Sequence, residues 1–332
     1  RKAPMKTPPK LINKSITLLF AFFTLILISG IGTAAEIFVQ PGNSIQTAIN
    51  SANPGDVIIV KPGTYIENIK VSKSNLTISS ESGNPENTVL QAKSIYANVF
   101  LLQGSNIKIT GLTITGASRS PNAGVNLSSS TKCVIEKNKF LNNSRGIYLL
   151  RSGGNTVSKN SVSNRGEFGI ALQNAVNNTI TGNSAMKNER GVYFGSSDDN
   201  IFSSNTIRNN NVYGIFICGL SDRNLIYNNY FNDTTMTVRT GVGNAYNITK
   251  RTGTNIVGGP YVGGNFWGKP DGKGFSQTAV DKDGDGVSDS AYKSITGSKV
   301  SDYLPLVIPK SYTSMPPIAK FGSNITSGNA PL

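Results

Sequence analysis

The chain has 332 residues, with 32 lysines and arginines against 18 acidic residues, a formal net charge of +14 and no histidine. This length suits one large domain with accessory segments, and the composition is broadly globular. The basic residues are scattered, without a basic run or an arginine-rich helix, which argues against nucleic-acid binding. Weak affinity for acidic glycans is compatible with the charge, but we favour a solvated basic surface as its explanation.

The N-terminus has the pattern of a secretory leader. Small residues as far as Ala35 follow an apolar run from Ile16 to about Ile31, and the run is preceded by Arg1, Lys2, Lys6, Lys10 and Lys14. This order predicts a signal peptide over residues 1–35 and a secreted or cell-surface protein. Its cleavage would remove five positive charges and reduce +14 to +9. An uncleaved anchor is the alternative, and it would be the only membrane contact.

A short amphipathic helix is expected after the leader. Ile45, Ala48 and Ile49 fall at positions i, i+3 and i+4 between Ser44 and Ser51, and an Asn-Pro-Gly turn at 53–55 ends the pattern. A strand at 57–60 and a turn at 61–65 follow. Because a repetitive region comes next, this helix is well placed to cover its open end.

The region from Gly124 to Phe231 repeats itself. A glycine followed by an apolar β-branched residue recurs every 22 or 23 residues, at Gly124, Gly146, Gly169, Gly191 and Gly214. Apolar residues then alternate, as in Gly-Ile-Tyr-Leu at 146–149, which is typical of a strand with one buried face. The 3.6-residue period of helical repeats is absent.

A column of asparagines keeps the same interval, at Asn138, Asn160, Asn183, Asn205 and Asn229. Stacked amides about 4.8 Å apart can hydrogen-bond from coil to coil, so we expect a structural role for this column. Coils of roughly 22 residues that contain short strands predict an all-β fold. Specifically, we expect a right-handed parallel β-helix (a solenoid) with a short N-terminal capping helix.

Two features of the repeats bear on function. Polysaccharide hydrolases use paired carboxylates, and Asp198 and Asp199 are the weak catalytic candidates, although aspartate favours turns at such a position. The nearest arginines in the sequence, Arg190 and Arg208, form no motif with them. The third residue of each glycine-led strand points away from the core, which makes Tyr148, Tyr193 and Phe216 candidate ligand-binding residues, because sugar rings stack on aromatic faces. The alternative is that loops or a partner domain cover these rings.

Cys133 and Cys218 lie three coils apart in the repeat register, roughly 14 Å at strand spacing, which is too far for a disulfide. We expect two packed thiols. Asn-X-Ser/Thr sequons permit N-glycosylation where the host performs it. They occur at Asn75, Asn126, Asn142, Asn177, Asn232, Asn247 and Asn324.

Both ends of the repeat region resemble known families. Residues 44–80, with their PGD and PGTY turns, resemble the start of pectin-lyase-like β-helix proteins. Residues 244–268, the DKDGDGVSDSAYK segment at 281–293 and the DYLPL segment at 302–306 resemble the C-terminal part of β-helix proteins similar to the NosD family, accessory proteins of nitrous oxide reductase. Residues 36–306 fit this pattern, which is common in archaeal surface proteins.

The name of that family implies copper, but this sequence does not. It has no histidine, its cysteines are distant in the predicted register, and its methionines are dispersed, at Met5, Met186, Met236 and Met315. Soft metal ligands are therefore missing, and we expect no copper site.

The segment from Asp281 to Asp289 has the spacing of a calcium-binding loop. Carboxylates at Asp281, Asp283, Asp285 and Asp289, with a glycine at position 6, match the way an EF-hand-type loop surrounds Ca²⁺, and Val287 would contribute its backbone carbonyl. Tyr292 stands where a glutamate is usual. We predict a structural calcium site that rigidifies the C-terminal segment, with a plain acidic turn as the alternative.

These patterns predict four parts: a signal peptide (1–35), a β-helix with its cap (36–255), a C-terminal segment with the Asp-rich loop (256–308), and a linker with the start of a PKD-like domain (309–332), which the last 17 residues resemble. The predicted function is that of a monomeric, non-catalytic envelope scaffold that binds a cell-envelope polysaccharide or glycoprotein. The alternative is a polysaccharide lyase or glycoside hydrolase that acts on an acidic glycan.

Overall fold

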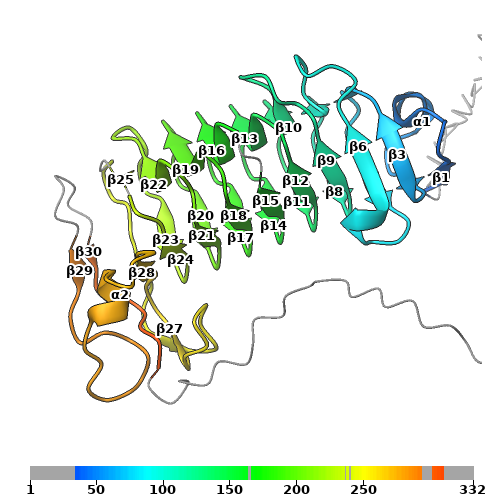
Figure 1. Ribbon diagram of the computed structural model, residues 1–332. Helices are drawn as coiled ribbons and strands as arrows, with labels where there is room; N and C mark the ends of the chain where they lie inside the picture. Colours follow the sequence, from blue (N-terminus) through cyan, green and yellow to red (C-terminus); the bar gives the residue numbers. More distant parts are fainter. Residues whose placement is uncertain (1–33, 164–165, 236, 239–240, 294–300, 310–332) are drawn as a thin grey trace, which may run out of the picture. The chain divides into compact units, whose positions relative to one another are not determined.

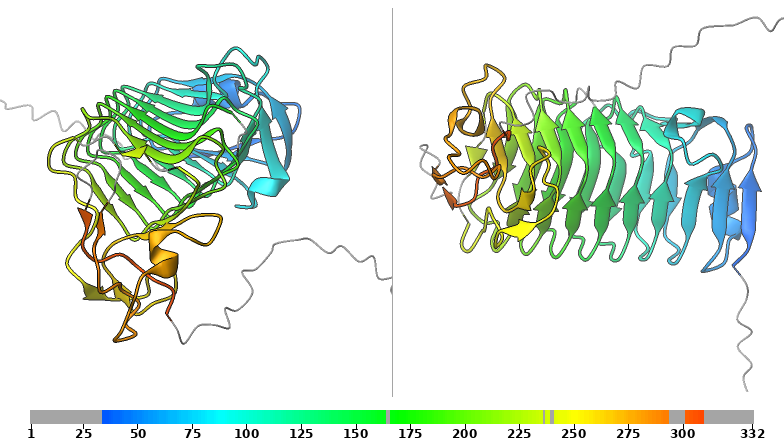
Figure 2. Two further views of the ribbon diagram at one scale, coloured as in Figure 1. Left: turned by 60° about the vertical axis from the view of Figure 1, so that its left-hand side comes forward. Right: turned by 90° about the horizontal axis from the view of Figure 1, so that it is seen from below.

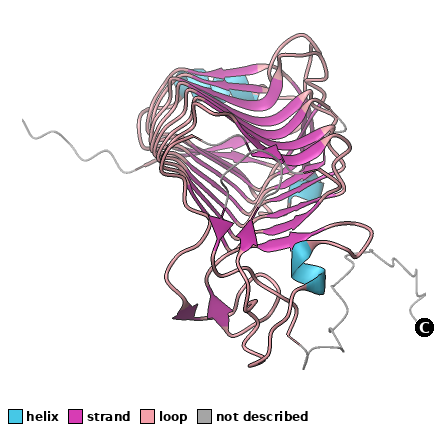
Figure 3. Ribbon diagram, turned by 90° about the vertical axis from the view of Figure 1, so that its left-hand side faces the viewer, coloured by secondary structure: helices cyan, strands magenta, loops and turns pink. Residues whose placement is uncertain are grey.

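The computed structural model describes residues 34–163, 166–235, 237–238, 241–293 and 301–309. Three parallel sheets form the walls of a right-handed β-helix, which confirms the predicted fold (Figures 1 and 3). The PKD-like segment and all but the last two residues of the predicted signal peptide lie outside the described residues. Among the helices that are described, none is long and apolar enough to cross a membrane.

Each coil contributes one strand to each wall, and we name the walls sheets A, B and C (Figure 2). Sheet A contains, in stacking order, β1 (Glu36–Val39), β2 (Val57–Val60), β5 (Thr77–Ser80), β8 (Lys108–Thr110), β11 (Val134–Glu136), β14 (Thr156–Ser158), β17 (Thr179–Thr181), β20 (Ile201–Ser203) and β23 (Leu225–Tyr227). Sheet B contains β3 (Gly63–Ile66), β6 (Thr88–Gln91), β9 (Thr113–Thr115), β12 (Lys139–Leu141), β15 (Ser161–Ser163), β18 (Ser184–Met186), β21 (Thr206–Arg208), β24 (Tyr230–Asn232) and β28 (Phe266–Gly268). Sheet C contains β4 (Ile69–Val71), β7 (Phe100–Leu102), β10 (Ala123–Ser128), β13 (Arg145–Leu150), β16 (Phe168–Gln173), β19 (Arg190–Gly195), β22 (Tyr213–Ile217) and β25 (Thr237–Val238).

Residues at equivalent positions of successive coils pair in register, as the repeat interval predicts. In sheet C the paired inward residues are Val125, Ile147, Ile170, Val192 and Ile215, and all are buried. The apolar columns before and after the predicted asparagines are fully buried as well, for example Ile135 and Phe140. Stacking therefore builds one continuous apolar core from coils that could not bury their own inner faces alone.

Asparagine side chains form three ladders along the stack. In the predicted ladder, from Asn138 to Asn229, each Nδ2 donates to the Oδ1 of the next ladder residue at 2.9–3.2 Å. The structure extends this ladder beyond the prediction to Asn265, whose Nδ2 donates to the carboxylate of Asp302 at 3.3 Å. A second ladder runs from Asn155 to Asn244. A third connects Asn188 and Asn210 to Asp233. The ladders satisfy buried amides and fix the register of the coils.

A residue with left-handed backbone precedes the ladder asparagines. Examples are Lys159 (φ 55°) before Asn160 and Asp199 (φ 57°) before Asn200. This conformation turns the chain at each corner, so that the first residue faces solvent and the asparagine faces the core. Glycine, asparagine and aspartate adopt it most readily, which explains their abundance at the corners.

The helix α1 (Ile45–Ser51) lies within the predicted range, and Ser44 caps its start, because the Ser44 side chain accepts a hydrogen bond from the Thr47 N–H at 3.1 Å. Ile45, Ala48 and Ile49 are buried against the first strands, as expected for a cap over the open end. The region 61–65 differs from the predicted turn, since strand β3 begins within it. Tyr65 packs into the core, and its hydroxyl donates to the carbonyls of Val39 and Lys61.

The C-terminal segment closes the opposite end. Strand β28 extends sheet B beyond the expected boundary at residue 255, and the Trp267 ring stacks between Phe231 at 4.9 Å and Tyr292 at 4.6 Å. The remaining elements are the antiparallel pairs β26 (Arg251–Thr252) with β27 (Tyr261–Val262) and β29 (Tyr292–Lys293) with β30 (Ser301–Asp302), the helix α2 (Phe275–Thr278) and a 3₁₀ turn at Pro85–Asn87.

Candidate functional site

The outer face of sheet C carries the three predicted aromatic residues in one register column. Tyr148, Ala171, Tyr193 and Phe216 pair from coil to coil in this order. The rings of Tyr193 and Phe216 stack with 5.8 Å between their centroids, and both residues, like Tyr148, are partly exposed. Ala171 is buried between its neighbours. The structure therefore brings the predicted rings onto one surface, with a gap of one coil after Tyr148.

A second column, which the sequence analysis missed, lies beside the first. It consists of the residues before the repeated glycines, Arg145, Phe168, Arg190 and Tyr213, so that cations and aromatic rings alternate. The Phe168 ring lies 5.2 Å from that of Tyr193, and the Tyr213 ring lies 5.5 Å from that of Phe216. We call these two columns, without Ala171, the sheet C face.

The repeated glycine explains why the second column was missed. Strict alternation would turn the residue before the glycine inward, but the ladder of paired residues skips the glycine itself. A side chain at Gly124, for example, would start 2.7 Å from the Phe140 ring and 2.9 Å from the Gly146 carbonyl oxygen. The sequence signal that was available is the Arg, Phe, Arg, Tyr order before successive glycines.

The arginines of the sheet C face contact rings and carboxylates together. The Arg145 guanidinium lies 4.5 Å from the Tyr148 ring centroid and pairs with Glu167 at 3.3 Å. The Arg190 guanidinium lies 5.6 Å from the Phe168 ring and pairs with Glu189 at 2.9 Å. These contacts hold the guanidinium groups in place beside the rings.

Tyr193 and Tyr213 stay protonated at neutral pH. Burial raises the pKa of Tyr213 and, to a smaller extent, that of Tyr193. A neutral phenol both donates and accepts hydrogen bonds. The face thus combines apolar rings, phenol hydroxyls and arginine–glutamate pairs.

Loops from the preceding coils border this face. The loop before Ala123 reaches across one coil, where the Ser120 hydroxyl donates to the Glu167 carboxylate at 3.0 Å. The guanidinium of Arg119 in the same loop lies 5.9 Å from the ring of Tyr96, which is 70% exposed on the neighbouring loop between β6 and β7 (Figure 1). Polar and aromatic side chains therefore continue beyond the sheet on this side.

Asp198 and Asp199 lie in the corner between β19 and β20, as a turn predicts. Asp199 makes a bidentate ion pair with Arg223 of the next coil, with both N–O distances at 2.7 Å. One Asp198 oxygen accepts the Asp222 N–H at 2.9 Å, and the other lies 3.6 Å from Arg223. Arg223 is the arginine that meets the pair, not Arg190 or Arg208. It lowers the pKa of Asp199, whereas a general acid needs a raised pKa.

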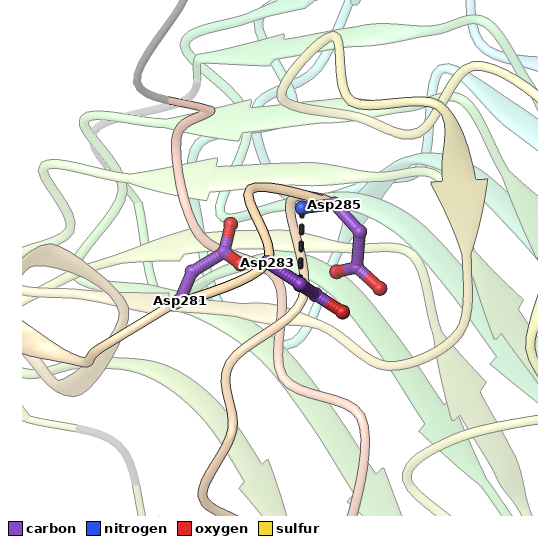
Figure 4. Close-up of side chains that lie close together, drawn as sticks. All are labelled: Asp281, Asp283 and Asp285. Carbon is purple, nitrogen blue, oxygen red and sulfur yellow. Dashed lines mark hydrogen bonds between the residues drawn. The ribbon is translucent and has the colours of Figure 1, made fainter.

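Three of the four aspartates of the Asp-rich loop come together. One carboxylate oxygen from each of Asp281, Asp283 and Asp285 lies within 4.8 Å of the others (Figure 4). Asp281 is buried and accepts the N–H groups of Gly284 at 2.8 Å and Gly286 at 2.9 Å. Burial raises its pKa, but these hydrogen bonds outweigh burial, and the pKa is lowered.

The other predicted ligands of this loop, Asp289 and Val287, are not part of the trio and make other contacts. Asp289 accepts the Lys282 N–H at 3.2 Å, and Val287 forms an antiparallel bridge with Leu306. Asp285 pairs with the ammonium group of Lys250. A hard, oxygen-preferring cation suits the trio. The Lys250 ammonium neutralises part of the negative charge of the trio through its pair with Asp285.

The residues present do not fit copper. Among the described residues, the aspartate trio is the one group of three or more histidine, cysteine or acidic side chains close enough to share an ion, and its ligands are hard oxygens. Cys133 is buried against backbone carbonyls, and burial raises the pKa of its thiol. The Met186 sulfur accepts a hydrogen bond from Arg208. Both cysteines are free, as predicted, although Cys218 is only half-buried. The side chains of Met5, Met236 and Met315 lie outside the described part of the chain.

Fold and surface together define a parallel β-helix protein with an aromatic outer face. The family model described as periplasmic copper-binding protein (NosD) matches residues 49–272, which is 224 of the 332 residues. The chain belongs to the NosD family.

A curated relative is a cell surface glycoprotein from Methanothermus fervidus, 33% identical over 135 residues, which cover 39% of this chain and 21% of the relative. The chain thus spans about a fifth of that relative's length. The PL6 family alginate lyase AlyGC (TM-score 0.51, 18% identity, 63% of this chain and 34% of that chain) and the pectate lyase Pel9A (TM-score 0.51, 16% identity, 68% and 73%) are similar solved structures. At these identities the similarity concerns the fold alone.

Proposed function

We propose that this chain is a secreted or cell-surface β-helix protein that binds carbohydrate on the sheet C face and has no catalytic role. The observation that carries the proposal is the register column in which Tyr148, Tyr193 and Phe216 share one outer surface. The leader-like N-terminal sequence supports the location outside the cell, and so does the name of the Methanothermus fervidus relative.

The geometry of the face suits an extended glycan. Adjacent coils lie about 4.8 Å apart, so the distance from Tyr148 to Phe216 is three strand spacings, about 14 Å, enough for a few sugar units along the stack. The rings stack on the apolar faces of sugars. The arginine–glutamate pairs place donors and acceptors beside the rings, where they reach hydroxyl groups. Because the sheet holds these groups before binding, little ordering entropy is lost.

The contacts of Asp198 and Asp199 weigh against the alternative of a lyase or hydrolase. The Asp199 carboxylate is occupied by a guanidinium group, its pKa is lowered, and the corner position gives both residues a structural use. If this pair were catalytic, the Asp198→Asn and Asp199→Asn variants would lose the activity of the unchanged protein. We expect no release of unsaturated or reducing sugars from a polysaccharide panel by the unchanged protein, and a release that both variants abolish would contradict the proposal.

The proposal includes a structural calcium ion at the Asp-rich loop. Asp281, Asp283 and Asp285 supply carboxylate oxygens, and the Val287 carbonyl and Asp289 are the further ligands that the loop spacing predicts. The bound ion would displace the Lys250 ammonium from Asp285. Because Val287 packs with Phe266 and Leu306, the ion would fix the loop against the end of the β-helix.

A glycan array with the mature chain, residues 36–332, tests the binding function. We expect retention of one class of envelope polysaccharide and loss of that signal in a Tyr148→Ala, Tyr193→Ala double variant. The matched control is Tyr303→Ala, because Tyr303 is a 65% exposed aromatic residue outside the sheet C face. No binding to any glycan, or equal binding by the double variant, would overturn the proposal.

A further inference from the structure

The corner geometry of the coils creates two exposed glycosylation sequons. Most ladder asparagines follow a residue with left-handed backbone, and Asn143, which is buried and accepts the Ala117 N–H at 3.1 Å, has the same position in its corner. Where the left-handed residue is also asparagine and a hydroxyl residue follows the ladder position, the corner reads Asn-Asn-Ser or Asn-Asn-Thr. This happens at Asn142 (φ 51°) and Asn177 (φ 56°). In both, the first asparagine is exposed and the second, Asn143 or Asn178, is buried.

Two other sequons lie within strands, and their asparagines are only partly exposed. Asn126 lies on sheet C between its register neighbours Leu101 and Tyr148, and Asn232 lies on sheet B between Arg208 and Gly268. The side-chain oxygen of each is buried and has no hydrogen-bond partner among the described residues. Each of these side chains projects from a sheet face between the side chains of the neighbouring strands, about 4.8 Å away on both sides, which restrict access to its amide.

Two further sequons are tied by hydrogen bonds. The Asn75 oxygen accepts the Asn106 amide at 2.7 Å, and the Asn247 oxygen accepts the Tyr303 N–H at 3.2 Å. Asn324 lies outside the described residues. Asn75 is also exposed with a left-handed backbone (φ 61°), so Asn142 and Asn177 differ from it in that their side chains form no hydrogen bond within the described part of the chain.

We infer that the protein carries N-linked glycans at Asn142 and Asn177, whereas the sequons at Asn126 and Asn232 remain unmodified in the folded chain. The glycan donor is an oligosaccharide phosphate linked to a lipid carrier. The side-chain nitrogen forms a bond to the anomeric carbon, the bond from that carbon to the phosphate oxygen breaks, the lipid phosphate leaves, and one amide proton is released to a base.

Both modified corners flank sheet C. Asn142 lies between β12 of sheet B and β13 of sheet C, and Asn177 lies between β16 of sheet C and β17 of sheet A. Glycans at these corners would lie beside the two ends of the sheet C strands, where the chain enters and leaves the sheet. They would leave the aromatic face open. The inference rests on the passage to the cell exterior proposed above, but not on carbohydrate binding.

Secretion of the chain from a yeast that performs N-glycosylation tests the inference directly. Peptide mass spectrometry after enzymatic release of the glycans in heavy-oxygen water reads the occupancy of each site. We expect label at Asn142 and Asn177, loss of one glycan in each of Asn142→Gln and Asn177→Gln, and no change in Asn126→Gln or Asn232→Gln. A Thr179→Ala variant, which keeps Asn177 but removes its sequon, should also lose one glycan.

Unmodified Asn142 and Asn177 in the secreted, folded chain would overturn the inference, and so would glycans at Asn126 or Asn232. Circular dichroism of the secreted protein confirms that the occupancy belongs to folded chains. Because a heterologous secretory pathway supplies the glycan, this result is independent of whether the sheet C face binds carbohydrate. The glycan array on unmodified protein reports on that function separately.

Discussion

Asn183 shows what a ladder position does at the scale of one residue. Its side-chain oxygen accepts the backbone N–H and the amide of Asn160 at 3.0 and 2.9 Å, and its Nδ2 donates to Val157 at 2.8 Å and to Asn205 at 3.0 Å. Hydrogen bonds of this kind stabilise little in net terms, but a buried group left without its partner is costly.

We therefore expect Asn183→Ala to lower the free energy of unfolding by about 3 kcal/mol or more, because several buried groups lose their partners. Urea denaturation measures the change. The matched control is Asn211→Ala, since Asn211 is exposed, and its effect should stay within about 0.5 kcal/mol. Equal effects of the two substitutions would show that the ladder contributes no special stability.

Asp302 ends the predicted ladder with a buried carboxylate and gives the stability a pH dependence. Burial raises its pKa to about 6, against the opposing effect of hydrogen bonds from Asn265, Trp267 and Leu304. Its ordinary value in an unfolded chain is 3.8. The folded state therefore binds the proton more tightly, and stability rises as the pH falls through about 6 towards 4. Burial also raises the pKa of Asp233, so that group acts in the same direction.

The expected gain from Asp302 is at most about 3 kcal/mol between pH 7.5 and pH 4.5. The difference in melting temperature between these pH values should shrink in Asp302→Asn, which cannot titrate. The comparison with this variant separates Asp302 from exposed carboxylates such as Asp199, whose lowered pKa acts in the opposite direction. An unchanged pH dependence in the variant would contradict the assignment.

At the scale of elements, the Asp-rich loop gives a prediction about metal removal. Calcium bound by Asp281, Asp283 and Asp285 should raise the melting temperature, and a chelator should reverse the rise, because the ion stabilises only the folded loop. Asp283→Asn should abolish most of the response. Asp271→Asn is the control, since Asp271 is an exposed aspartate outside the loop. If calcium does not change the melting temperature of the unchanged protein, the loop is a plain acidic turn and not a calcium site.

The sequence predicted the elements whose signal is periodic. The glycine interval predicted the strands of sheet C, the Asn138 column predicted one ladder, and the positions of Ile45, Ala48 and Ile49 predicted the capping helix. The other two ladders keep the same interval, but the ladder that includes Asn188 and Asn210 changes residue type at Asp233. Asp302 could not be predicted as a ladder residue, because 37 residues separate it from Asn265 and no repeat connects them.

The candidate site was predicted in part for a related reason. Alternation by two placed Tyr148, Tyr193 and Phe216 on the outer face, where they lie. Applied to Arg145 and Arg190, the same alternation would turn them inward. The repeated glycine interrupts the pattern, so their guanidinium groups reach the outer rings. Arg223, the partner of Asp199, was missed because it lies in the next coil, 24 residues away in the sequence. The arginines nearest in the sequence, Arg190 and Arg208, were compared instead.

At the scale of the molecule, different parts of the β-helix have different roles. The core and the three ladders hold the coils in register, the two ends are closed by α1 and by the segment around Trp267, and sheet C presents aromatic rings outward. The inferred glycans at Asn142 and Asn177 would lie beside the ends of the sheet C strands. The proposed binding function therefore depends on the sheet C face and not on the corner at Asp198 and Asp199.

A binding isotherm with the polysaccharide selected on the array tests this central claim most directly, measured by calorimetry for the mature chain, Tyr193→Ala and Tyr303→Ala. We predict saturable binding by the unchanged protein, about tenfold weaker binding by Tyr193→Ala because one stacked ring is lost, and unchanged binding by Tyr303→Ala. Equal affinities for all three proteins, or weaker binding by Tyr303→Ala alone, would contradict a carbohydrate site on the sheet C face.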